Sequence, residues 1–218
     1  MTFSLLARDP LTGSLGGVAA TGNLCVGGWV LRGDARGGLT ASQGLTPSTL
    51  WGEDALAALV AGASVGDALD SVVSDDPGRD ARQLLVMSAD GSTATFDGAG
   101  NHPFTGHLTG DGWVVAGNWL TSSKVIEEAA EAFATTPGAF EERLLAALSA
   151  GATAGSDQRG TLSAALLAVA PDRPPLTLRV DHDERPVERL AALYARTRAR
   201  DYIDWLDTLP TRRNPGKA

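Results

Sequence analysis

The second residue of this chain brings together two groups that acyl-transfer chemistry needs. When Met1 is removed, Thr2 carries a hydroxyl nucleophile and a free α-amine on the same residue. The reference pKa of an α-amine is about 8, so the amine can accept the proton of the attacking hydroxyl near neutral pH. The competing interpretation is that Thr2 is only the first β-branched residue of a strand.

Other polar residues are placed where predicted strands end. Asn118 follows the run VVAG, and its amide nitrogen is a candidate hydrogen-bond donor to an oxyanion. Alternatively, it is a turn residue that tolerates unusual backbone angles. Gln43 ends the run TASQ, and Thr21 and Asn23 belong to ATGN. We expect these three side chains to line the same mouth as Thr2.

A polar segment, GSDQRG, precedes an apolar run. Asp157 and Arg159 in this segment can pair with each other, orient a substrate or bind a substrate carboxylate through the planar guanidinium group. The alternative is an ion pair that only fixes the loop. Because lysines are scarce, we expect an arginine to supply any cation that lowers the pKa of the nucleophile, with Arg32, Arg36 and Arg159 as candidates.

Composition argues against several other kinds of site. The formal net charge is −8, and no basic stripe with interleaved aromatic residues is present before residue 180, so we expect no nucleic-acid partner. His102 and His107 in HPFTGH are separated by Pro103 and Gly106, which prevent a helical zinc site, so no metal is predicted. The phosphate-loop pattern is missing from the sequence, and no cofactor is predicted.

The single cysteine, Cys25, rules out an intrachain disulfide framework and is typical of a reducing compartment. No apolar run is long enough to cross a bilayer, and no secretory leader precedes the first predicted strand. We therefore expect a cytoplasmic protein that acts on a small-molecule substrate and has no membrane partner.

The elements that must position these residues come in groups. The runs FSLLARD and SLGGVAA predict an antiparallel hairpin, and LCVGGWVLRG and GGLTASQG are expected to extend the same sheet. Apolar spacing predicts two helices between Ser48 and Val73. Strands predicted in RQLLVMSADGSTATFDG and GDGWVVAGNW imply a second sheet. After them the sequence predicts two helices within residues 122–151 and then two closing strands. Grouped helices and strands favour two antiparallel sheets over alternating βαβ units.

After Pro186 the sequence predicts a further amphipathic helix. Leu190, Tyr194, Trp205 and Leu206 fall on its apolar side. The last residues, PTRRNPGKA, are expected to fray. Aromatic residues on an unpartnered helix would be exposed, so we expect this tail to pack on the same domain or to form a homodimer interface.

Several stretches, taken in order, resemble one family. They are MTFSLLARDPLTG, GGVAATG, ASQG, RQLLVMSADG, TGHLTGDGWVVAGNWL and GSDQRGTLSAALLAV. Together they resemble the bacterial family catalogued as domain of unknown function 1028, which is similar to the amino-terminal-nucleophile (Ntn) hydrolases. The resemblance extends to about residue 182. The segments TGNLCVGG and GAGNHPFTGH depart from the family pattern and predict an altered pocket.

The resemblance implies an α+β fold, a four-layer αββα sandwich of two antiparallel sheets. We therefore expect an Ntn-hydrolase-like domain over residues 1–183 and a helical tail over residues 184–218. The resemblance also implies hydrolysis of a C–N bond in a small amide, ureido or cyclic imide-like compound, with Thr2 as nucleophile. The alternative is a protein of the same fold that binds a small ligand without turnover.

Overall fold

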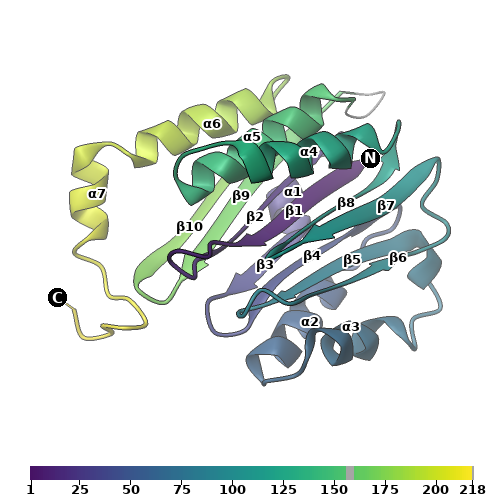
Figure 1. Ribbon diagram of the computed structural model, residues 1–218, viewed down its shortest axis with the longest axis horizontal. Coiled ribbons are helices and arrows are strands. Elements are labelled where there is room, and N and C mark those ends of the chain that lie inside the picture. The colour runs from purple at the N-terminus through teal and green to yellow at the C-terminus, as the bar shows by residue number, and fades with distance from the viewer. Residues whose placement is uncertain (156–159, 218) are drawn as a thin grey trace.

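The computed structural model describes residues 1–155 and 160–217. Its elements form four layers, which are helices, a six-stranded sheet, a four-stranded sheet and a second set of helices (Figure 1). All strand pairs within the two sheets are antiparallel. The predicted α+β sandwich of two antiparallel sheets is therefore confirmed.

The two sheets divide the strands of the described chain unequally. The strands are β1 (Thr2–Arg8), β2 (Leu15–Thr21), β3 (Leu31–Asp34), β4 (Gly38–Gly44), β5 (Arg82–Ser88), β6 (Thr93–Asp97), β7 (Phe104–Gly110), β8 (Trp113–Leu120), β9 (Ser163–Ala170) and β10 (Arg173–Val180). The larger sheet has the order β10-β9-β2-β1-β8-β7, and the smaller sheet has the order β3-β4-β5-β6. Strand β1 therefore lies inside the larger sheet, between β2 and β8.

Helices cover the outer face of each sheet. The helices of the described chain are α1 (Val26–Trp29), α2 (Thr49–Val60), α3 (Val65–Val73), α4 (Lys124–Thr135), α5 (Phe140–Thr153), α6 (Pro186–Thr197) and α7 (Arg200–Leu206), with a 3-10 turn at Arg79–Ala81. Helix α1 is not on an outer face, because its Val26 packs in the cluster between the sheets. In Figure 1, α4, α5 and α6 lie over the larger sheet, and α2 and α3 lie under the smaller one. The interface between the sheets is thus shielded on both sides.

Apolar side chains fill each of the three interfaces between layers. Phe3 and Leu148 belong to the cluster between the larger sheet and its helices. Leu6 and Met87 belong to the cluster between the two sheets, and Trp51 belongs to the cluster between the smaller sheet and its helices. Burial of this apolar surface is the main force that holds the layers together.

The alternation of side chains along β1 decides where Thr2 points. Phe3 and Leu5 pack in the cluster on the helical side, whereas Leu6 packs in the cluster between the sheets. Successive residues of a strand face opposite sides, so Thr2 and Ser4 share the side of Leu6. The hydroxyl that sequence analysis selects therefore faces the space between the two sheets.

The expectation that LCVGGWVLRG and GGLTASQG extend the first sheet is wrong. Residues Val26–Trp29 form α1, and β3 and β4 belong to the smaller sheet. The Cys25 N–H donates to the Asp181 carbonyl at 3.0 Å, and the Val26 N–H donates to Ser163 Oγ at 3.1 Å. These contacts hold α1 at the end of the larger sheet and outweigh the local β propensity.

Other predicted elements are confirmed, with two differences. The first hairpin, the helix pairs α2–α3 and α4–α5, the β5–β6 hairpin and the two closing strands all form. Strand β8 was expected in a second sheet but pairs with β1 in the larger one. Strand β7, FTGHLTG, was not predicted because its two glycines and its exposed edge position weaken the strand signal.

The C-terminal tail differs from the single helix that was predicted. The backbone is extended at Ala199, and the tail forms α6 and α7 on either side of a break there. Leu190 and Tyr194 of α6 are buried in the cluster over the larger sheet, whereas Trp205 of α7 is exposed. Helix α6 therefore packs on the sandwich. The homodimer interface stays a prediction.

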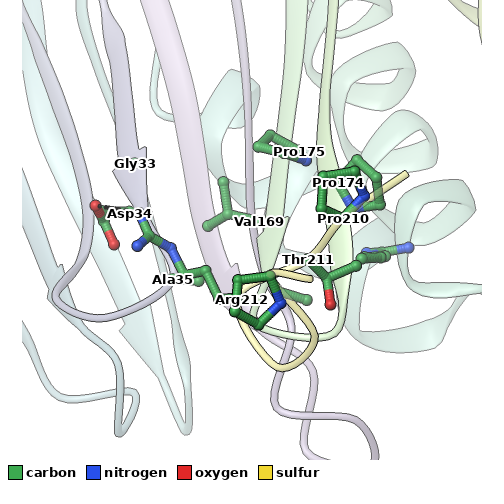
Figure 2. A pocket seen from close by; sticks show the side chains of 12 residues that line it. Gly33, Asp34, Ala35, Val169, Pro174, Pro175, Pro210, Thr211 and Arg212 are labelled. Carbon is green, nitrogen blue, oxygen red and sulfur yellow. Dashed lines mark hydrogen bonds and ion pairs between the residues drawn. The ribbon is translucent and has the colours of Figure 1, made fainter. Parts of the chain in front are cut away.

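The last residues are docked and not frayed, contrary to expectation. The Arg213 N–H donates to the Pro171 carbonyl at 2.9 Å, and Arg212 forms an ion pair with Asp34 at 3.1 Å. This segment closes one side of a cavity of about 620 Å³. Figure 2 shows Asp34 on one side of this cavity and Thr211 on the other. The ion pair and the backbone hydrogen bond explain why the segment stays against β3 and β10.

Candidate active site

A second cavity, of about 290 Å³, opens where β1, β2 and β4 meet α1. The residues that line it are Thr2, Thr21, Asn23, Leu24, Val26, Trp29, Val30, Gln43, Gly44, Leu45 and Pro47. It shares no residue with the larger cavity under the C-terminal tail, whose lining contains a single hydroxyl, from Thr211. The smaller cavity contains Thr2 and is therefore the candidate site.

The hydroxyl of Thr2 is held by its neighbour on β2. Thr21 Oγ1 donates to the Met1 carbonyl oxygen at 2.6 Å and lies 3.0 Å from Thr2 Oγ1. A hydroxyl has one proton to donate, and Thr21 gives its proton to Met1. Thr2 is therefore the donor in the hydrogen bond between the two threonines, which orients its hydroxyl in the cavity wall.

Thr2 belongs to a row of polar residues that crosses the larger sheet. Asn118 of β8 and Thr21 of β2 pair directly with Thr2, and Ser163 of β9 pairs with Thr21. Directly paired residues of antiparallel strands point to the same face, so this row faces the smaller sheet. Ser163 Oγ donates to the Asn23 carbonyl at 2.8 Å, which fixes the loop that follows β2.

A second polar row, on the smaller sheet, faces the first. Gln43, Gln83 and Asp97 are direct partners on β4, β5 and β6. Gln83 Oε1 accepts from Gln43 Nε2 at 2.6 Å and from Asn118 Nδ2 at 3.1 Å. Ser4 Oγ donates to Gln43 Oε1 at 2.9 Å. Hydrogen bonds therefore join the two sheets directly behind the candidate nucleophile.

Asp97 sets the direction of these hydrogen bonds. Gln83 Nε2 donates to Asp97 Oδ1 at 2.6 Å, and His107 Nδ1 lies 2.6 Å from Asp97 Oδ2. An ionised carboxylate only accepts hydrogen bonds, so Gln83 turns its NH₂ group toward Asp97 and its oxygen toward Asn118. Asn118 must then present its own NH₂ group to Gln83. The carboxylate thus determines how the amide beside Thr2 is oriented.

The backbone next to the site is unusual at three positions. Cys25 (φ 60°) precedes α1, and Trp119 (φ 58°) follows Asn118; they are the two non-glycine residues with positive φ in the described chain. Such conformations cost about 1–3 kcal/mol each. Gly44 has a φ of 138°, and a Cβ there would lie 2.5 Å from the Ala81 carbonyl oxygen. Only glycine allows β4 to end in this way beside the cavity.

The structure brings five of the predicted site residues together. Thr2, Thr21, Asn23 and Gln43 line the cavity. Asn118 is buried beside Thr2 on the neighbouring strand and is not part of the lining. One of its two N–H groups is used in the network behind the cavity, which leaves the second for another acceptor.

The predicted arginines are not brought to Thr2 within the described part of the chain. Arg32 and Arg36 form ion pairs with carboxylates at 3.0 and 2.7 Å, and neither lines the cavity. Asp157 and Arg159 lie outside the described residues, and their roles stay predictions.

Ser4, Gln83 and Asp97 were not predicted from the sequence. These three residues complete the network, and Ser4 and Gln83 are fully buried. The sequence contained a signal for Gln83, because this amide residue directly precedes the apolar run LLVM of a predicted strand. A buried amide needs hydrogen-bond partners, and that requirement indicates a network.

Within residues 1–155 and 160–217, no group of three or more His, Cys, Asp and Glu side chains is arranged to hold a metal ion. Of the two histidines in HPFTGH, His107 contacts Asp97 and Thr95. None of the helices in the same residues is long and apolar enough to cross a membrane.

A family model described as "Family of unknown function (DUF1028)" matches residues 2–190. The chain belongs to the DUF1028 family. The matched region contains every strand of the sandwich, and it begins at Thr2. The family resemblance seen in the sequence is therefore confirmed.

Solved structures similar to this DUF1028 chain include protein SPO2555 from Silicibacter pomeroyi, also described by the DUF1028 family model. It is 46% identical, with a TM-score of 0.95, and the match covers 99% of this chain and 94% of that chain. Eukaryotic HslV from Trypanosoma brucei is 15% identical, with a TM-score of 0.47, and the match covers 77% of this chain and 99% of that chain. A comparison with curated proteins gives no match.

Proposed function

We propose that this DUF1028 protein hydrolyses a C–N bond in a small amide, ureido or cyclic imide-like compound, with Thr2 as the nucleophile after removal of Met1. The observation that carries the proposal is the position of the Thr2 hydroxyl in the wall of a cavity, between two sheets and at the start of β1. The resemblance to Ntn hydrolases and a family match that begins at Thr2 support it.

In the first proposed step, Thr2 Oγ1 attacks the carbonyl carbon of the substrate, and the α-amine of Thr2 takes the hydroxyl proton. The resulting ammonium gives this proton to the leaving nitrogen as the C–N bond breaks. The amine product departs, and the acyl group remains as an ester on Thr2. Water then attacks the ester carbonyl and gives a proton to the amine, which returns it to Oγ1 as the ester bond breaks and the acid is released.

The neighbours of Thr2 support this scheme. Asn118 retains one N–H group after its hydrogen bond to Gln83, and this donor is suited to an oxyanion that forms beside Thr2. Removal of Met1 also removes the carbonyl oxygen to which Thr21 now donates. The Thr21 hydroxyl is then free to form a hydrogen bond with the new α-amine of Thr2, the residue that also carries the nucleophile.

A second candidate function is supported by the position of Met1. Its side chain is only 6% exposed and belongs to the apolar cluster on the helical side of the larger sheet. A retained Met1 would block the α-amine, and the protein would then bind a small ligand in the same cavity without turnover. The intact mass of the purified protein separates the two functions, because only the hydrolase requires loss of Met1.

The proposed hydrolase is tested with Thr2→Ala and Thr2→Ser against a panel of small amides, ureido compounds and cyclic imides. Thr2→Ala should abolish turnover, and Thr2→Ser should retain part of it because both reacting groups remain. Thr93→Ala, at the start of β6, is a control that should leave the rate unchanged. Turnover by a correctly processed Thr2→Ala protein would reject Thr2 as the nucleophile.

A further inference from the structure

The cavity at Thr2 has no charged side chain among the described residues that line it. Its polar groups come from Thr2, Thr21, Asn23 and Gln43, which all lie on the side of the larger sheet or at the end of β4. The remaining side chains of the lining are apolar, namely Leu24, Val26, Trp29, Val30, Leu45 and Pro47. The cavity thus has a polar end at the candidate nucleophile and an apolar remainder.

The apolar remainder is exposed in the free protein. Leu24, Trp29 and Leu45 are 49%, 53% and 52% exposed, although most large apolar side chains of this chain are buried. A ligand that covers them removes apolar surface from water, which is favourable in proportion to the area covered. Grouped exposed apolar side chains beside a cavity are typical of a binding surface.

The wall that carries Trp29 is held in place before any ligand binds. Helix α1 is fixed at its start by the hydrogen bonds of Cys25 and Val26 to the ends of β9 and β10. Gly28 lies against the Arg179 guanidinium, where a Cβ would be 3.0 Å from Nη2. A preformed wall does not lose conformational entropy when it binds a ligand, and it selects ligands by shape and polarity.

Among the described residues that line the cavity, a charged acyl group has no side chain of opposite charge to pair with. Arg179, which lies against Gly28, already pairs with Asp181 at 2.8 Å. Arg82, which donates to the Thr46 carbonyl beside Leu45, already pairs with Asp76 at 2.8 Å. Moving a carboxylate or an ammonium group out of water without an opposite charge carries a large penalty. The described part of the lining therefore disfavours the binding of ionised groups.

We propose that this site accepts substrates whose acyl part is compact, apolar and uncharged, with Trp29, Leu45 and Val30 as the residues that determine this specificity. The inference rests on the proposed function, in which the scissile carbonyl lies at Thr2. A cavity of about 290 Å³ is at the small end of ligand sites, so the acyl part is short.

The test uses 4-nitroanilides of three acyl groups of matched length: pentanoyl, succinyl and 4-aminobutanoyl. These share one leaving group and differ in terminal charge, so kcat/KM should be at least about tenfold higher for pentanoyl than for either charged compound. Leu45→Arg places a cation on the rim and should shift the preference toward succinyl. Leu50→Arg is the matched control, since Leu50 is 64% exposed and does not line the cavity, and it should leave the preference unchanged.

Binding separates failure of this inference from failure of the proposed function. The same three anilides are titrated calorimetrically into Thr2→Ala, which cannot use the hydroxyl. Selective binding of the pentanoyl compound without turnover by the native protein would reject the hydrolase and keep the acyl specificity. Equal or tighter binding of a charged anilide, or binding of none, would overturn the specificity. If Leu45→Arg changes the oligomeric state but not the selectivity, the exposed apolar surface at Leu45 is a protein interface, and the proposed acyl specificity is also overturned.

Discussion

Replacing Gln83 with methionine tests whether the buried amide network holds the candidate site together. Methionine is close to glutamine in length but lacks the amide, so the substitution keeps the volume and removes the hydrogen bonds. Three side-chain groups lose a partner, which are Gln43 Nε2, Asn118 Nδ2 and Asp97 Oδ1, at present 2.6, 3.1 and 2.6 Å from the Gln83 amide. The carbonyl oxygens of Gly117 and Gly106 lose the Gln83 Nε2 donor as well, at 3.1 and 3.4 Å.

The loss can be estimated from these three contacts. Each side-chain amide that loses this partner costs about 1 kcal/mol, and the lost hydrogen bond to the carboxylate costs about 2 kcal/mol, so the free energy of unfolding should fall by at least about 4 kcal/mol. Met87→Leu, on the same strand and facing the same interface, is a volume-conserving control that should cost less than about 1.5 kcal/mol.

Urea unfolding measures both variants. With a slope of about 2 kcal/mol per molar urea, the midpoint for Gln83→Met should fall by about 2 M at an unchanged slope. Turnover should fall as well where the variant is still folded, because the Asn118 amide is no longer oriented. A stability loss no greater than that of Met87→Leu would refute the network as a source of stability.

Two further predictions concern the outer parts of the fold. Leu190→Ala should lower the free energy of unfolding by about 2–5 kcal/mol, because the Leu190 side chain of α6 is fully buried against the sandwich. Leu193, on the same helix, is more than a third exposed, so Leu193→Ala should cost only about 0.5 kcal/mol. Equal losses of stability in thermal unfolding would show that α6 is not packed on the sandwich. The side-chain hydrogen bond from Arg36 lowers the pKa of Asp34 from its ordinary value of 3.8 to about 2. Since the folded pKa is the lower one, the Asp34 carboxylate stabilises the protein above about pH 4, and this contribution is lost as the pH falls toward 2. Asp34→Asn should therefore be less stable than the native protein at pH 7 and equally stable near pH 2, and a difference in unfolding free energy that does not shrink with pH would contradict the ion pair.

The layered fold follows from sequence patterns where local propensity and tertiary packing agree. The hairpin around PLTG and the helix pairs have both a clear period and turn residues at their ends. Helix α1 could not be predicted, because its conformation depends on hydrogen bonds to Asp181 and Ser163, far away in the chain. The docked tail depends in the same way on the ion pair of Arg212 with Asp34.

The candidate site was predicted where a residue's chemistry is evident from its type and position. Thr2, Thr21, Asn23 and Gln43 all come at strand ends, and strand ends of one sandwich meet at a common edge. The partners behind them could not be identified, because the pairing of Gln43 with Gln83 depends on the register between β4 and β5. The register between β5 and β6 in turn brings the Asp97 carboxylate into line with the two amides.

The central claim is that Thr2 acts through a free α-amine. It is tested most directly by inserting a lysine between Met1 and Thr2, because methionine aminopeptidase does not remove methionine before a large residue. Intact mass verifies both N-termini, and hydrolysis of the pentanoyl anilide is then compared at equal protein concentration. We expect the native chain to have lost Met1 and to be active, and the extended chain to keep its fold and fall to the Thr2→Ala background. Undiminished hydrolysis by the extended chain, or by a native chain that retains Met1, would contradict the claim.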